Sequence, residues 1–242
     1  MDDVPSSPSA EPREIEIAPF ERIQFTPEQE RHVDLMRSVA RAITTHTGEN
    51  YVLKGGTALL LAYDLPRYSE DLDLDGKRPS VDLTRSIAIG SLQQGLRVER
   101  LTTKKNTDTT KRHMLHYGTG SGDLLKIEAS FRQSETINED DVTSIDGIRV
   151  YKIEKLTPLK VEAFLNRLAA RDIFDVAFLL KRYPDSVSDD YLHKIDELVA
   201  TIGLNELETT MLNDNILRGH DLAHVALSLI ESLDDLKTKR GL

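Results

Sequence analysis

The sequence predicts an α+β fold followed by a helical C-terminal half. Ser69, Asp71, Asp73 and Asp75 recur at every second position, and Leu72 and Leu74 point to the other face, which is the period of a β-strand. Three more strand-like segments lie between residues 96 and 131, separated by polar or glycine-rich turns, as in an antiparallel meander. Beyond residue 155 the apolar residues recur at helical spacing. We therefore expect a disordered arm over residues 1–20, an α+β core over 21–154 and a helical domain over 155–242.

The composition excludes several classes of protein. The chain has 242 residues, enough to bury a core, and it contains no cysteine, so it has neither disulfides nor thiolate chemistry. No apolar run approaches the roughly 18 residues that span a bilayer. The acidic N-terminus lacks the charged-then-apolar pattern of an export signal. These features predict a cytoplasmic protein without membrane contact.

The first predicted helix begins at Pro27. Thr26 and Gln29 form a capping box around this proline, which suits the first helical position. Gly48 ends the helix. The elements expected next are a strand over 51–53 and a helix over 57–63, which Pro66 prevents from continuing.

The middle of the chain is predicted to form most of the sheet. After the alternating segment 69–75, Asp82 is expected to cap a helix that contains Leu83 and Ile87. The remaining strands are predicted over 96–102, 111–117, 124–131 and 148–151.

The C-terminal half is predicted to be helical throughout. Thr157 and Pro158 repeat the cap-plus-proline pattern of the first helix, so we expect a helix to begin here. It is expected to run without a break past Lys160 and Arg171 until Pro184 ends the segment. Further helices are predicted near 189–202, 204–214 and 219–236.

Carboxylates on the alternating strands indicate a metal site. Asp71 and Asp73 project from the same face of one strand, next to Ser69. Hard divalent cations prefer carboxylate oxygens and leave room for substrate phosphates. Glu128, on another alternating strand, is the candidate for a third ligand. The sequence therefore predicts that Asp71, Asp73 and Glu128 hold a cation for phosphoryl transfer.

A glycine pair precedes this site. Lys54, Gly55, Gly56 and Thr57 link a strand to a helix. Glycines allow close approach of the backbone to a phosphate, and a helix N-terminus offers free N–H groups. The turn is therefore a candidate phosphate site, although a Gly-Gly pair is also a common structural turn.

Positive charge is concentrated in one segment of an acidic chain. The formal net charge is −10, which argues against a broad basic surface for nucleic acid. The segment 97–113 runs against this trend, and it is either a polyanion-binding patch or a solvated hairpin. Its basic residues are Arg97, Arg100, Lys104, Lys105, Lys111 and Arg112.

Two blocks of the sequence resemble a known family. Residues 54–74 read KGGTALLLAYDLPRYSEDLDL, and residues 159–180 read LKVEAFLNRLAARDIFDVAFLL. They resemble the signatures of the AbiEii/MenT nucleotidyltransferases, the toxins of bacterial toxin–antitoxin and abortive-infection pairs. The segment Lys126-Ile127-Glu128 lies between the blocks at a matching place.

The resemblance implies both a fold and an activity. It implies a polymerase-β-like core with a mixed or antiparallel sheet, followed by a C-terminal helical bundle. It also implies Mg²⁺ (or Mn²⁺), transfer of a nucleotide from an NTP to an RNA acceptor such as the 3′ end of tRNA, and a cognate antitoxin protein.

The resemblance also assigns roles to individual residues. Asp71 and Asp73 match the metal-binding pair, and Lys160 and Asp172 match the catalytic residues of the later motif. The residues assigned to nucleotide binding are Lys54, Gly55, Gly56, Thr57, Arg67, Ser69 and Arg171.

Three other interpretations remain open. Arg171 and Asp175, four residues apart, are also spaced as an ion pair on a helix surface. Asp71-x-Asp73-x-Asp75-Gly76 matches the start of a calcium-binding EF-hand loop, although its twelfth position is Asp82 instead of glutamate. The acidic net charge favours a nucleotidyltransferase that modifies a small molecule instead of RNA.

Overall fold

A computed structural model describes residues 20, 23–118, 123–134 and 137–242. The arm expected over residues 1–20 lies outside the described residues except for Phe20. Part of the expected glycine-rich turn after residue 117 lies outside them as well.

Within the described residues, seven strands form one mixed sheet in the order β3-β4-β5-β2-β1-β7-β6. The pairs β3–β4, β4–β5, β1–β2 and β6–β7 are antiparallel, so the predicted meander is confirmed. The pairs β2–β5 and β1–β7 are parallel. The strands are β1 (Tyr51–Lys54), β2 (Asp71–Gly76), β3 (Val98–Asn106), β4 (Thr110–Tyr117), β5 (Leu124–Ser130), β6 (Val142–Ile145) and β7 (Ile148–Tyr151).

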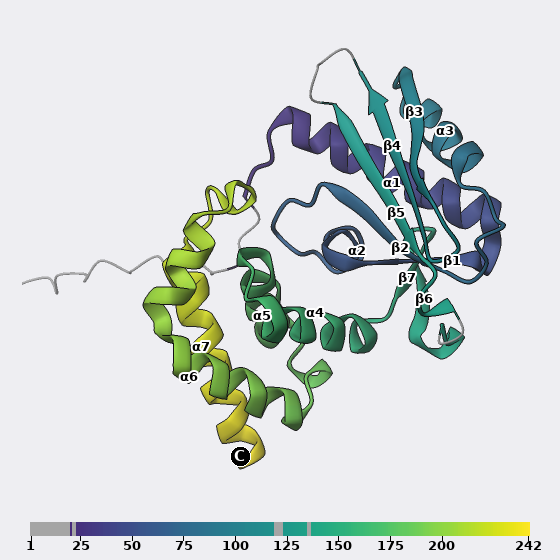
Figure 1. Cartoon of the computed structure of the whole chain (residues 1–242). Coiled ribbons are helices and arrows are strands. Elements are labelled where there is room, and N and C mark those ends of the chain that lie inside the picture. The colour runs from purple at the N-terminus through teal and green to yellow at the C-terminus, as the bar shows by residue number, and fades with distance from the viewer. Residues whose placement is uncertain (1–19, 21–22, 119–122, 135–136) are drawn as a thin grey trace, which may run out of the picture.

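The helices form two groups around this sheet. Figure 1 shows α1 and α3 along one side of the sheet, and α4 to α7 on the side of α2. The helices are α1 (Pro27–Thr47), α2 (Gly55–Ala62), α3 (Thr84–Gln93), α4 (Ile153–Arg167), α5 (Ala170–Arg182), α6 (Asp189–Leu212) and α7 (Leu222–Arg240). The α+β fold with a helical C-terminal half is therefore confirmed.

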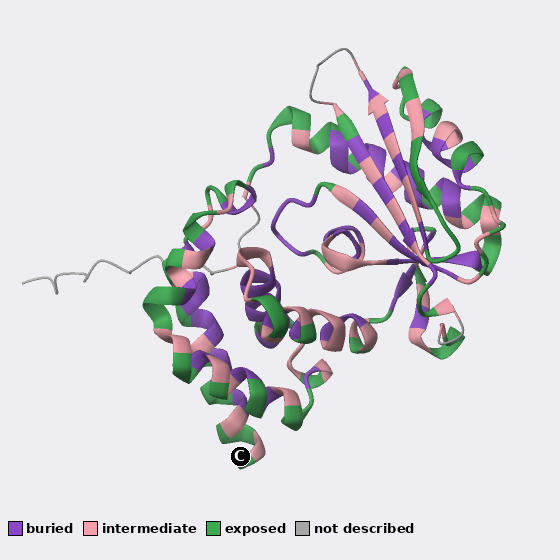
Figure 2. Ribbon diagram, viewed as in Figure 1, coloured by how far each residue is buried: buried purple, intermediate pink, exposed green. Residues whose placement is uncertain are grey.

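Alternation along β5 separates the core from the polar face. Leu125, Ile127 and Ala129 are fully buried, whereas Lys126 and Glu128 between them are half-buried. Figure 2 shows the same alternation of buried and half-buried residues on the central strands. One face of the sheet thus packs into the core, and the other carries polar side chains.

The helices α1 and α3 pack closely at a glycine. A Cβ added to Gly90 would lie 2.6 Å from the Cα of Val39, so only glycine allows this approach. The hydroxyl of Ser38 donates to the carbonyl oxygen of Gly90 at 2.8 Å. The predicted capping box of α1 at Thr26 and Gln29 is also present.

Two expected helix starts are wrong. The N-cap of α3 is Leu83, and Asp82 instead accepts a hydrogen bond from the hydroxyl of Thr84. The helix α4 begins at Ile153 and has Pro158 inside it. It starts early because the backbone N–H of Leu156 already donates to the carbonyl of Lys152, at the end of the sheet.

The expected continuous helix through Lys160 and Arg171 is also wrong. Leu168 adopts a left-handed conformation, with φ 46° and ψ 43°, and it separates α4 from α5. Gly203 (φ 76°, ψ 166°) interrupts α6 near the boundary expected there. The expected junction near residue 154 falls in the first turn of α4.

Candidate active site

The acidic residues of β2 and β5 lie on neighbouring parallel strands. The register pairs Asp73 with Glu128 and Asp71 with Lys126. Paired residues on adjacent strands are roughly 5 Å apart and point to the same face. The sheet therefore places Glu128 beside the two aspartates of β2.

Basic side chains bind two of these three carboxylates. The ammonium of Lys126 lies 2.5 Å from Oδ2 of Asp71, and the guanidinium Nε of Arg112 donates to Oε2 of Glu128 at 2.6 Å. Asp73 has no such partner within the part of the chain that the structure describes. Burial, and then the neighbouring charge of Asp71, raise the pKa of Asp73 above its usual value.

The donor set suits a hard cation that also binds substrate. Among the described residues, no group of three or more histidine or acidic side chains is arranged to hold a metal ion. Mg²⁺ does not require such a group, because it is usually bound through one or two carboxylates together with substrate phosphates and water. Asp71 and Asp73 supply two carboxylates on a rigid strand, and they fit this mode of binding.

The glycine turn lies directly against Asp73. Gly55 has φ +77°, and a Cβ added there would lie 3.1 Å from Oδ2 of Asp73. A side chain at Gly55 would therefore be strained and would crowd this carboxylate. Glycine therefore lets the N-terminus of α2 approach this carboxylate closely.

A buried network supports this turn. The hydroxyl groups of Thr57 and Ser69 are hydrogen-bonded at 2.7 Å, and Thr57 also donates to the carbonyl oxygen of Asp71. A Cβ added to Gly56 would lie 2.7 Å from Nη2 of the buried Arg67. Thr57, Ser69 and Arg67 therefore lie behind the turn and connect it to β2.

Lys54 and Asp75 form a separate buried contact. The ammonium of Lys54 donates to Oδ1 of Asp75 at 2.6 Å, and the hydroxyl of Tyr151 donates to Oδ2 at 3.1 Å. Both carboxylate oxygens of Asp75 are therefore already paired within the protein. In addition, Asp71–Gly76 forms a strand instead of a loop between helices. The EF-hand interpretation of this segment is wrong.

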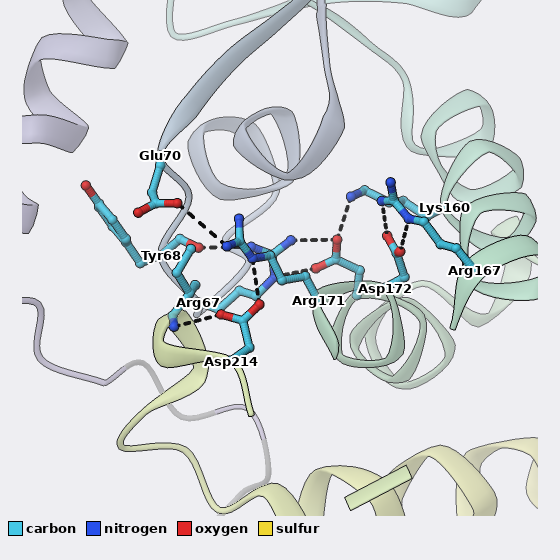
Figure 3. A network of polar contacts seen from close by, with 10 residues as sticks. Arg67, Tyr68, Glu70, Lys160, Arg167, Arg171, Asp172 and Asp214 are labelled. Atoms are coloured by element: carbon cyan, nitrogen blue, oxygen red, sulfur yellow. Dashed lines mark hydrogen bonds and ion pairs between the residues drawn. The ribbon is translucent and has the colours of Figure 1, made fainter. Parts of the chain in front are cut away.

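The later motif forms ion pairs between α4, α5 and the core (Figure 3). Lys160 lies 2.6 Å from Oδ2 of Asp175, which also binds Arg67. Asp172, 1% exposed, accepts two hydrogen bonds from Arg167. This role of Arg167 could not be predicted from the sequence, because the pair depends on the break at Leu168.

Arg171 points away from Asp175. Its Nε donates to Asp214 at 2.9 Å, and its Nη2 lies 3.6 Å from Glu70. The surface pair expected between Arg171 and Asp175 is therefore wrong. Arg171 instead joins α5 to the segment before β2 and to the turn after α6.

The basic residues of the β3–β4 hairpin lie on two faces of the sheet. Arg112 pairs in register with Glu128, and Lys105 pairs with Arg112. Arg100 contacts His116 on the same face at 3.3 Å. Lys111 pairs with the buried Ala129 and so belongs to the opposite face. The hairpin therefore brings Arg100, Lys105 and Arg112 to the face of Asp71.

Known structures share this architecture. The crystal structure of JHP933 from Helicobacter pylori matches with a TM-score of 0.77 and 28% identity, over 89% of this chain and 94% of that chain. A putative nucleotidyltransferase from H. pylori matches with a TM-score of 0.77 and 29% identity, over 89% and 97% of the two chains. MenT4, the nucleotidyltransferase toxin Rv2826c from Mycobacterium tuberculosis H37Rv, has a TM-score of 0.52 and 13% identity, over 88% and 86%, which shows similarity of fold alone. No curated protein sequence matches the chain.

The fold and the family together define a nucleotidyltransferase. Residues 37–228 match the family described as "Nucleotidyl transferase AbiEii toxin, Type IV TA system", and the chain belongs to this family. Membership implies an NTP substrate and an antitoxin partner. In the described part of the chain, no helix is long and apolar enough to cross a membrane.

Proposed function

We propose that this protein is a toxin that transfers a nucleotide from an NTP to an RNA acceptor, the 3′ end of tRNA, in the bacterial cytoplasm. The observation that carries the proposal is the arrangement of Asp71 and Asp73 on β2. They lie beside Glu128 on β5, and Asp73 lies against the glycine turn at Gly55.

Asp71 and Asp73, with Glu128 beside them, would hold Mg²⁺ (or Mn²⁺). The bound cation would neutralise charge that develops on the transferred phosphate. The backbone at Gly55 and Gly56 would bind the triphosphate, because it lies at the N-terminus of α2 beside Asp73. Oxygen ligands on a strand and a glycine turn beside them form a rigid site for this substrate.

The remaining residues of the motifs would act around this centre. Thr57, Ser69 and Arg67 hold the turn from behind through the contacts described above. Lys160 lies in the adjacent ion-pair network, and we assign it to a phosphate contact, with Asp172 and Arg171 positioning α5. Lys54 would act through its contact with Asp75 beside Asp73.

The positive charge on the polar face of the sheet supports a polyanionic acceptor. Arg100, Lys105 and Arg112 share the face of Asp71 in a protein whose net charge is −10. Positive groups beside the reacting centre attract a phosphate backbone. The overall acidity supports a second candidate, a nucleotidyltransferase that acts on a small molecule.

The two candidates differ in where the label goes. The purified protein is incubated with Mg²⁺, each labelled NTP and total tRNA, and the RNA is resolved on a denaturing gel. We expect label at the 3′ end of tRNA, and no label with the matched Asp71→Asn variant. Wild-type protein that leaves every RNA unlabelled but labels small molecules in an extract would support the second candidate instead.

A further inference from the structure

We infer that Lys126 is a nucleotide-binding residue which occupies the metal position at Asp71 until substrate arrives. The inference rests on the proposed function, and it adds a role for a side chain that the activity does not itself require. In the structure its ammonium lies 2.5 Å from Oδ2 of Asp71, and each of the two side chains is 34% exposed.

Strand pairing makes this contact persistent. Lys126 and Asp71 are partners in the parallel register of β5 and β2. Both strands lie inside the sheet, where a neighbouring strand on each side restrains the backbone. The ammonium is carried on a flexible four-carbon stem, which can move although the backbone is fixed.

A divalent cation and Lys126 compete for the same carboxylate. A cation that binds Oδ2 of Asp71 replaces the ammonium, because both bind the same oxygen at short distance. The neighbouring acceptor on β5 is Glu128, to which Arg112 already donates at 2.6 Å. Asp73, which also interacts electrostatically with Lys126, would hold the same cation as Asp71. The displaced ammonium therefore remains over the polar face without an equivalent protein partner.

The triphosphate supplies the missing partner. It would lie between Asp71 and the turn at Gly55, on the face that carries Lys126. Phosphate oxygens form strong charge-assisted hydrogen bonds with an ammonium group. Lys126 thus weakens binding of the cation alone and strengthens binding of the cation together with NTP, so that the two ligands bind as a pair.

The test measures binding instead of turnover. Mn²⁺ binding is measured by the electron paramagnetic resonance signal of free Mn²⁺, and NTP binding in saturating Mn²⁺ is measured by calorimetry. The variants are Lys126→Gln, Lys126→Arg and, as a control with the same change of charge, Lys239→Gln on the exposed end of α7.

The expected changes have opposite signs. In Lys126→Gln, we expect Mn²⁺ alone to bind about threefold more tightly, because a competing surface ion pair is lost. NTP should bind about tenfold more weakly, because a hydrogen bond to a charged group is lost. Lys126→Arg should retain NTP binding close to that of wild type, and Lys239→Gln should match wild type in both measurements.

Other outcomes overturn the inference in distinguishable ways. If Lys126→Gln weakens both ligands or changes neither, Lys126 has a structural role or none, although the proposed function stands. If wild-type protein binds neither Mn²⁺ nor NTP, the proposed function itself fails. Lys126→Met, which retains the aliphatic stem, replaces Lys126→Gln in every comparison if the glutamine variant does not fold.

Discussion

Arg67 and Asp175 form a two-point ion pair across 108 residues of sequence. Nε and Nη2 of Arg67 donate to Oδ1 and Oδ2 of Asp175, each at 2.7 Å, and the side chains are 2% and 0% exposed. Lys160 binds the same carboxylate from α4. The pair joins α5 to the segment before β2, so the helical half and the strand that carries Asp71 and Asp73 are stabilised together.

Loss of this carboxylate is expected to destabilise the protein strongly. Asp175→Asn leaves the charges of Arg67 and Lys160 buried together without an anion. Removal of one partner from a buried pair costs about 3–5 kcal/mol in the free energy of unfolding. Urea denaturation followed by circular dichroism measures the change.

The control is an exposed acidic residue in a surface pair. Asp190→Asn removes the partner of Lys194 on α6, where both side chains are exposed. We expect a loss within about 1 kcal/mol. Equal effects of the two substitutions would contradict the structural importance of Asp175.

Asp73 is expected to be required for nucleotide transfer and to lower the stability of the folded protein when it is ionised. Its pKa is raised by burial and by Asp71. A carboxyl group with a raised pKa in the folded state favours folding while protonated, so its contribution is lost as the pH rises through that pKa. Asp73→Asn should therefore abolish nucleotide transfer and leave the melting temperature at pH 7 equal to or above that of wild type.

The pH dependence provides the check on this assignment. As the pH rises above about 3.9, the usual aspartate pKa, the wild type should lose stability relative to Asp73→Asn, because the pKa of Asp73 is raised in the folded protein. If Asp73→Asn transfers nucleotide at the wild-type rate, Asp73 does not belong to the active site. A variant that unfolds would indicate a structural role instead.

Local pattern predicted the residues that share a face, but it could not predict their ion-pair partners. Alternation along β2 and β5 places Asp71, Asp73 and Glu128 on one face, and this follows from the two-residue period alone. The contact between Lys126 and Asp71 depends on β5 lying next to β2 in parallel. That neighbour order is set by packing of the whole sheet, and no short segment encodes it.

The C-terminal motif shows a second reason why contacts could not be predicted from the sequence. Leu168 takes a left-handed conformation that favours glycine, so its sequence gives no sign of the break between α4 and α5. The Thr157-Pro158 pattern suggested a helix start, yet the end of β7 sets that start at Ile153. Residues that pair across this break, such as Arg167 and Asp172, could not be matched from sequence.

Glu128→Gln is expected to reduce metal-dependent turnover far more than Glu99→Gln. Glu128 lies beside Asp73 in the register of the sheet, whereas Glu99 is an exposed residue of the edge strand β3. Both changes remove one negative charge, so a general electrostatic effect would be shared. Rates measured over a range of Mg²⁺ concentrations should show a higher Mg²⁺ requirement for Glu128→Gln alone, and equal effects would exclude Glu128 as a ligand.

Lys160→Met tests whether the later motif contacts the nucleotide. Asp175 retains Arg67 in this variant, so stability should fall less than in Asp175→Asn. Loss of a charge-assisted phosphate contact should raise the KM for NTP by about tenfold or more. Steady-state kinetics and thermal melting are measured on the same preparation. A change in melting temperature with unchanged kinetics would show that Lys160 acts only in packing.

The two faces of the β3–β4 hairpin allow a matched test of RNA binding. Arg100 and Lys105 lie on the face of Asp71, whereas Lys111 lies on the opposite face, and Lys104 lies at a shift in the strand register. Two double variants, Arg100→Gln with Lys105→Gln and Lys104→Gln with Lys111→Gln, each remove two positive charges. Arg112 is left unchanged in both because it binds Glu128.

The two variants should differ in their salt dependence. Each phosphate contact releases counterions, so log affinity for tRNA falls with log salt by roughly 0.7 to 0.9 per contact. The first variant should therefore have a flatter slope, weaker labelling of tRNA and less inhibition of growth, while NTP binding stays unchanged. The second should resemble wild type, because its lost charges do not face the active site. If the two variants lose affinity equally, the hairpin attracts RNA only through total charge, and if neither changes, tRNA binds elsewhere on the protein.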